Sequence, residues 1–128
     1  MTRFVIDAYA WIEYLEGSEK GKKVSEIVED KSNELFTSST TVAEIISKFL
    51  RTSKDVKIAL TAVDTLSVII MIDREISTLA GHIHFEAKKK FKDFGMLDAF
   101  VAATAKSVNA KILTGDNDFK NFKEAVMI

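Results

Sequence analysis

Short apolar, β-branched runs alternate with amphipathic helical patterns along this chain, and this alternation limits its fold more than any other feature. The runs cover residues 4–6, 35–36, 68–72 and 112–113, with a fifth candidate at 125–128. Such runs predict short buried strands. Strands that alternate with helices form a parallel sheet with helices on both faces. We therefore expect a three-layer α/β/α fold around a short central parallel sheet of four to five strands.

A residue that can cap a helix precedes most of the helical patterns. Asp73 begins a pattern that continues to about residue 91, and Gly95 begins one over about 96–108. The expected caps are Ser18, either Ser39 or Thr40, Ser53, Asp73 and Gly95.

The size and composition predict a soluble, single-domain protein. A chain of 128 residues with 47% hydrophobic residues and a net charge of -1 can bury one core. We expect one domain over residues 1–128. The absence of cysteine excludes thiolate metal ligands. Asp7 interrupts the opening apolar run before a secretory signal develops, and no run is long enough to span a membrane, so we expect a cytoplasmic protein without membrane association.

Two carboxylates stand where predicted strands end. Asp7 follows residues 4–6 directly, and Asp116 follows residues 112–113 after the turn of Thr114 and Gly115. Parallel strands present their carboxyl ends at one edge of the sheet, where ligands bind. Asp7 is equally suited to cap the next helix, and the two roles are compatible. Asp118 adds another acid to the polar turn, although Asx turns and helix caps would explain that turn as well.

Glu44 and Asp98 lie within predicted helices. Helical spacing places Glu44 on the polar side of its helix with Lys48, so the periodicity favours a solvated Glu44–Lys48 ion pair over a metal ligand. Asp98 begins a helix with hardly any polar face, where a carboxylate needs a partner or a cation. A first-turn acid favoured by the helix dipole explains Asp98 equally well.

Four motifs stand out along the chain: residues 5–11 (VIDAYAW), 39–44 (STTVAE), 97–99 (LDA) and 113–119 (LTGDNDF). Taken together, they resemble the motifs of the PIN domain, in the order that this family has. In length and ending the chain is most similar to VapC-type toxins of toxin–antitoxin pairs, and the resemblance covers essentially the whole chain. One departure is Ala8, where many relatives carry Ser or Thr.

The resemblance implies an endoribonuclease that uses Mg²⁺ or Mn²⁺ to hydrolyse RNA phosphodiester bonds. It implies RNA as the substrate, a cognate antitoxin protein as partner, and a homodimer. Asp118 would be an auxiliary acid, and Thr114 a hydroxyl near the pocket. The catalytic and metal-binding residues that it implies are Asp7, Glu44, Asp98 and Asp116.

Further residues are candidates for contacts with RNA or with a protein partner. Lysine runs on helices are more often simply solvated than bound to RNA. The first helix has apolar residues on nearly every side, so either a partner or neighbouring helices must cover them. The basic candidates are Lys48, Arg51, Lys54, Lys57, Lys88, Lys89, Lys90 and Lys92, and the apolar residues are Tyr9, Ala10, Trp11, Ile12, Tyr14 and Leu15.

Three rival functions share some of these features. A haloacid-dehalogenase-like phosphatase needs a second Asp two residues after the first, where Tyr9 stands. A receiver-type phospho-signalling domain would carry an acidic pair after the first strand, where Asp7 stands alone, although Asp73 does follow residues 68–72. A catalytically silent PIN-like module that binds RNA or protein is the third alternative.

Overall fold

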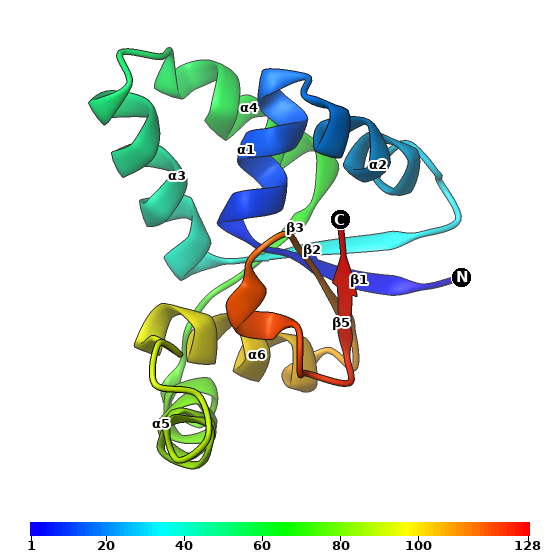
Figure 1. The fold of residues 1–128 in the computed structure, drawn as a ribbon. Helices are drawn as coiled ribbons and strands as arrows, with labels where there is room; N and C mark the ends of the chain where they lie inside the picture. Colours follow the sequence, from blue (N-terminus) through cyan, green and yellow to red (C-terminus); the bar gives the residue numbers. More distant parts are fainter.

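Five parallel strands form one central sheet in the computed structural model, which describes residues 1–128. Their order across the sheet is β3-β2-β1-β4-β5 (Figure 1). This confirms the expected parallel sheet with helices on both faces. The strands are β1 (Arg3–Ile6), β2 (Glu34–Ser38), β3 (Val68–Ile70), β4 (Lys111–Thr114) and β5 (Ala125–Met127).

The alternation of side chains along β1 divides the interior into two cores. Phe4 and Ile6 point to one face of the sheet, and Val5 points to the other, as the two-residue period of a strand requires. Trp11 and Val24 belong to the first core, while the helix Met96–Ser107 (α6) supplies much of the second. Both faces of the sheet are therefore buried.

Four helices cover the first face of the sheet and two cover the second (Figure 1). None of the helices has the length and apolar character needed to cross a membrane. On the first face lie α1 (Ala8–Glu16), α2 (Glu19–Val28), α3 (Ser39–Arg51) and α4 (Val56–Leu66), and on the second lie α5 (Arg74–Lys88) and α6 (Met96–Ser107).

Three of the expected helix starts are correct and two are wrong. Ser18, Asp73 and Gly95 stand at the predicted N-cap positions. Helix α3 is capped by Ser38, whose hydroxyl accepts a hydrogen bond from the amide of Thr40, rather than by Ser39 or Thr40. Helix α4 is capped by Asp55 rather than by Ser53, which has a left-handed backbone with φ of 57° in the preceding turn.

The strand order reverses direction at β1, and this reversal determines where two of the candidate acids lie. The chain passes from β1 through β2 to β3 on one side, and β4 and β5 lie on the other side of β1. Loops that leave β1 and β4 diverge at such a point and leave a crevice at the carboxyl ends of the strands. Asp7 lies immediately after β1, and Asp116 lies two residues after β4.

Candidate active site

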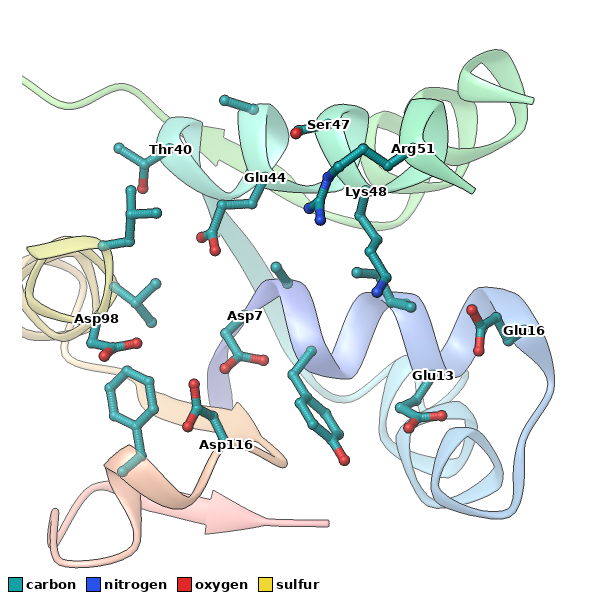
Figure 2. A pocket seen from close by; sticks show the side chains of 17 residues that line it. Asp7, Glu13, Glu16, Thr40, Glu44, Ser47, Lys48, Arg51, Asp98 and Asp116 are labelled. Atoms are coloured by element: carbon teal, nitrogen blue, oxygen red, sulfur yellow. The ribbon is translucent and has the colours of Figure 1, made fainter. Parts of the chain in front are cut away.

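A cleft of about 740 Å³ opens at this edge of the sheet. Its walls come from α1, α3, the start of α6 and the turn after β4. Figure 2 shows carboxylates from all four segments directed toward the same space. The structure thus brings together the four acids that were expected to converge, Asp7, Glu44, Asp98 and Asp116. We call this space the acidic cleft.

Asp7 is the most deeply buried of these acids, with 5% of its surface exposed. One carboxylate oxygen accepts a 2.9 Å hydrogen bond from the amide of Ala10 and caps α1, and the other accepts a hydrogen bond from the hydroxyl of Thr114. Burial raises the pKa of Asp7 from 3.8 to about 7, and the nearby charges of Asp116 and Glu44 add to the increase. The two hydrogen bonds oppose it in part. Asp7 therefore caps the helix and lines the cleft.

Thr114 links two of the acids. Its hydroxyl donates to Asp7 and accepts a 2.9 Å hydrogen bond from the backbone amide of Asp116. The side chain is fully buried, so these bonds are shielded from water. Ala8 has no hydroxyl to offer, and the side-chain hydroxyl that bonds the carboxylate of Asp7 comes from β4 instead.

Glu44 does not form the expected ion pair with Lys48. The four ion pairs of the structure leave both residues out. Glu44 is half-buried in the cleft, and burial, followed by the charge of Asp116, raises its pKa. The helical periodicity identified the polar side of α3 correctly, but that side faces the cleft rather than open solvent.

Asp98, Asp116 and Asp118 form the tightest group of carboxylates. Each offers an oxygen, and these oxygens lie within 4.8 Å of one another. Asp98 also accepts a 2.9 Å hydrogen bond from the amide of Gly95, so it lies in the first turn of α6 and helps to cap the helix. The carboxylate of Asp116 accepts a 2.9 Å hydrogen bond from the amide of Asp118 and holds the turn in shape.

Two acids of this group, Asp98 and Asp118, have raised pKa values. The pKa of Asp98 is raised to about 7, mainly by burial, and the charges of Asp116 and Asp118 contribute to this increase. Burial is also the largest cause of the raised pKa of Asp118, followed by the charge of Asp116. Carboxylates that repel one another at short range are suited to share a divalent cation, and Mg²⁺ and Mn²⁺ prefer such oxygen ligands.

Tyr9 is a cleft residue whose place the sequence did not predict. Its ring lies directly over Gly115, where an added Cβ would come within 2.3 Å of the ring. Lys20 donates a 3.0 Å hydrogen bond to the Tyr9 hydroxyl from outside the cleft. The ring thus lies beside the turn that carries Asp116, and only glycine fits beneath it. Tyr9 stands two positions after Asp7 in the sequence, but no spacing rule connects it with Gly115.

The other residues of α1 are mostly covered by the protein itself. Trp11 is fully buried, and its indole NH donates a 3.0 Å hydrogen bond to the hydroxyl of Thr37. Ile12, Tyr14 and Leu15 are partly buried and pack against the core on the first face of the sheet. Tyr9 is the most exposed of the group, at 37%.

Only two of the basic candidates line the acidic cleft, and these are Lys48 and Arg51. Lys54 forms an ion pair with Glu16, with 2.5 Å between the nitrogen and the carboxylate oxygen. Lys57 lines a separate groove on α4. No residue of the run at 88–92 lines the cleft, and Lys89 of that run pairs with Glu86.

Asp73, which the receiver alternative would phosphorylate, lies outside the cleft. Its carboxylate caps α5 through a 2.8 Å hydrogen bond from the amide of Ile76. The role that the structure shows for it is that of a helix cap.

Several solved structures share this fold. A toxin–antitoxin complex from Klebsiella pneumoniae matches with a TM-score of 0.74 and 19% identity, covering 96% of this chain and 95% of that one. VapC20 from Mycobacterium tuberculosis, described as a sarcin-ricin loop cleaving toxin, matches with a TM-score of 0.77 and 15% identity over 98% of both chains. DNA-bound VapBC from Salmonella typhimurium matches with a TM-score of 0.72 and 20% identity, covering 100% of this chain and 98% of that one.

Family comparison gives a more specific result than these distant structural likenesses. No protein of curated function matches the sequence significantly. The profile of the PIN domain matches residues 4–125, which include the acidic cleft and all four of its expected acids. The chain therefore belongs to the PIN domain family.

Proposed function

We propose that this protein is a metal-dependent endoribonuclease and the toxin component of a toxin–antitoxin pair. The observation that carries the proposal is the convergence of Asp7, Glu44, Asp98 and Asp116 in one cleft, from four separate segments of the chain. Membership in the PIN domain family supports a nuclease. The similar proteins that are described as toxins or as toxin–antitoxin complexes support the biological role.

The cleft suits Mg²⁺ or Mn²⁺. Asp98, Asp116 and Asp118 supply a compact set of oxygen atoms, and Asp7 and Glu44 lie on the same cleft. We propose Asp7, Glu44, Asp98 and Asp116 as the catalytic and metal-binding residues, with Asp118 as an auxiliary ligand. A bound divalent cation lowers the pKa of its water ligand and neutralises charge that develops on a phosphate.

The protein's own residues prepare the cleft for that chemistry. Thr114 holds the carboxylate of Asp7 and the backbone of Asp116 in fixed relation, so two ligands from β1 and β4 keep their positions. Glu44 approaches from α3, on the opposite wall from Asp116 (Figure 2). We assign it the orientation of the attacking water, because its carboxylate lines the cleft and burial raises its pKa, which makes it a better proton acceptor than an exposed carboxylate.

The remaining parts of the proposal concern partners and location. RNA is the substrate, and a cognate antitoxin and a second copy of the chain are the protein partners. Residues 1–128 form a single domain, and the protein acts in the cytoplasm. The description of similar structures as toxin–antitoxin and VapBC complexes supports the antitoxin partner.

RNA cleavage by the purified protein, with Mg²⁺, Mn²⁺ or EDTA, tests this function. We expect cleavage within the strand that needs the metal, and a loss of about 100-fold or more in Asp7→Asn and in Asp98→Asn, because each removes a charge from the metal site. Circular dichroism verifies that both variants fold. Asp55→Asn, at the exposed cap of α4, is the matched control and should cleave normally.

The same experiment distinguishes the alternatives. A protein that binds RNA but never cleaves it would be the silent PIN-like module. Full activity in either cleft variant would remove that residue from the proposed site.

A further inference from the structure

Two cations share the acidic cleft with the carboxylates. Lys48 and Arg51 lie on α3, on the same side of the helix as Glu44, and both line the cleft. At 1.5 Å of rise per residue they stand about 6 Å and about 10 Å further along the helix axis than Glu44. Figure 2 shows the Lys48 side chain reaching from α3 toward α1, and the Arg51 side chain extending back along α3 toward Glu44. The cleft is therefore negative at one end and carries free positive groups along α3.

Lys48 and Arg51 are unpaired although carboxylates are near. Glu13 and Glu16 line the same half of the cleft. Glu16 pairs with Lys54 at 2.5 Å, and Glu13 accepts a 2.5 Å hydrogen bond from the hydroxyl of Ser18. None of the four ion pairs of the structure involves Lys48 or Arg51. The two cations thus remain available to a ligand that enters the cleft.

The chemistry of these cations favours a phosphodiester backbone. A guanidinium presents a planar set of donors that matches two phosphate oxygens, and an ammonium acts as a point charge beside them. A polyanion drawn to the metal end of the cleft extends beyond the scissile phosphate, and its next phosphates need positive partners. The groups on α3 stand along that path, one and two helical turns from Glu44.

We infer that Lys48 and Arg51 form a subsite that binds the backbone phosphates next to the scissile one and so sets the path of the RNA strand along α3. This inference rests on the proposed function, because it takes RNA as the ligand of the cleft. The subsite binds any base sequence equally well, since it contacts only the backbone. It therefore contributes affinity and strand position rather than recognition of a particular sequence.

Binding of a fluorescent single-stranded RNA tests the subsite without relying on cleavage. Anisotropy is measured at several salt concentrations in an Asp98→Asn background, which prevents cleavage during the titration. A phosphate contact contributes about 0.7 to the slope of log affinity against log salt for single strands. We expect Lys48→Gln and Arg51→Gln each to lower the slope by about 0.7, and the double variant by about 1.4.

Two controls separate a specific subsite from a general effect of charge. Lys57→Gln removes the same charge from a groove on α4 and should leave the slope unchanged. Lys48→Arg and Arg51→Lys keep the charge and should preserve most of the slope. In cleavage assays with Asp98 restored, KM should rise more than kcat falls in the two Gln variants.

The outcomes separate this inference from the proposed function. If the protein cleaves RNA but both Gln variants keep the original salt slope, the subsite is wrong and the nuclease stands. If it binds RNA through Lys48 and Arg51 but does not cleave it, the subsite stands and the nuclease fails. Equal losses in Lys57→Gln and in the cleft variants would also overturn the subsite, because they would show only a response to net charge.

Discussion

The carboxylate of Asp7 caps a helix, although burial disfavours its negative charge. It caps α1 through Ala10 and receives the hydroxyl of Thr114, yet its charge lies in a buried position beside other acids. Burial disfavours the ionised form more than these two hydrogen bonds favour it, so its pKa is raised to about 7. The residue therefore helps to organise the fold when protonated and weakens it when charged.

The pH dependence of the melting temperature of the metal-free protein tests whether the pKa of Asp7 is raised in the folded state. The folded pKa of Asp7 lies above its ordinary 3.8, so its contribution to stability is fully present below that value and is lost as pH rises through about 7. Asp7→Asn keeps an oxygen for the cap but cannot ionise. We expect the melting temperature of Asp7→Asn minus that of the unchanged protein to increase as pH rises from about 4 to about 8.

Thermal unfolding in EDTA provides the measurement, and Asp55→Asn serves as a control at an exposed cap outside the cleft. A constant difference between Asp7→Asn and the unchanged protein across this pH range would contradict the raised pKa of Asp7.

At the scale of elements, the turn after β4 depends on one close contact. Gly115 has no side chain, and the ring of Tyr9 occupies the space that a Cβ would need, at 2.3 Å. Asp116 follows directly, so a movement of this turn also moves a carboxylate of the cleft. The start of α1 and the turn after β4 therefore position each other.

A double-mutant cycle measures this coupling. Gly115→Ala forces the Tyr9 ring or the turn to move, and we expect it to destabilise the protein by roughly 1–3 kcal/mol, as overpacking does. Tyr9→Ala opens the space, so Gly115→Ala should cost much less in that background. Chemical denaturation gives the four free energies of unfolding. Additive effects would show that the ring and the glycine do not share this space.

The strands were easier to predict than the helix starts. Apolar runs predicted the position of each strand, because a strand buried on both faces has few polar residues. The starts of α3 and α4 were placed wrongly because Ser38, Ser39 and Thr40 are chemically equivalent caps, as are Ser53 and Asp55. The choice depends on where β2 ends and on the left-handed residue at Ser53, which are features of the folded chain.

On the scale of the whole molecule, the cleft exists because the topology joins distant segments. Asp7 and Thr114 stand at the ends of two neighbouring strands, and Glu44 and Asp98 come from helices on opposite faces of the sheet. The acids at strand ends could be placed from sequence, because parallel strands end at one edge. Glu44 could not be placed from the residue pattern alone, because its position on the helix fits a solvated surface as well as a cleft wall. Only the resemblance of residues 39–44 to a family motif predicted that Glu44 lies in the cleft.

Metal binding should stabilise the whole fold. A cation that binds only the folded protein raises its stability by about 2.7 kcal/mol at 100 times the dissociation constant. We expect Mn²⁺ and Mg²⁺ to raise the melting temperature, and to do so more at pH 8 than at pH 5.5, because the carboxylates must lose their protons to bind the metal. Differential scanning calorimetry measures the shift.

Asp118→Asn should reduce this shift, because it removes charge from the tightest group of oxygens. NaCl at the same ionic strength controls for screening of the acids by salt. A melting curve that does not change at saturating metal would argue against a metal site in the cleft.

The pairing of β4 beside β1 has a consequence for how the molecule is made. The hydroxyl that holds Asp7 belongs to Thr114, 107 residues further along the chain. When the ribosome has synthesised β1, β2 and β3, Asp7 is present but Thr114 and Asp116 are not yet part of the chain. Whatever reaction the cleft performs, a nascent chain cannot perform it on the messenger being translated until β4 has emerged and docked.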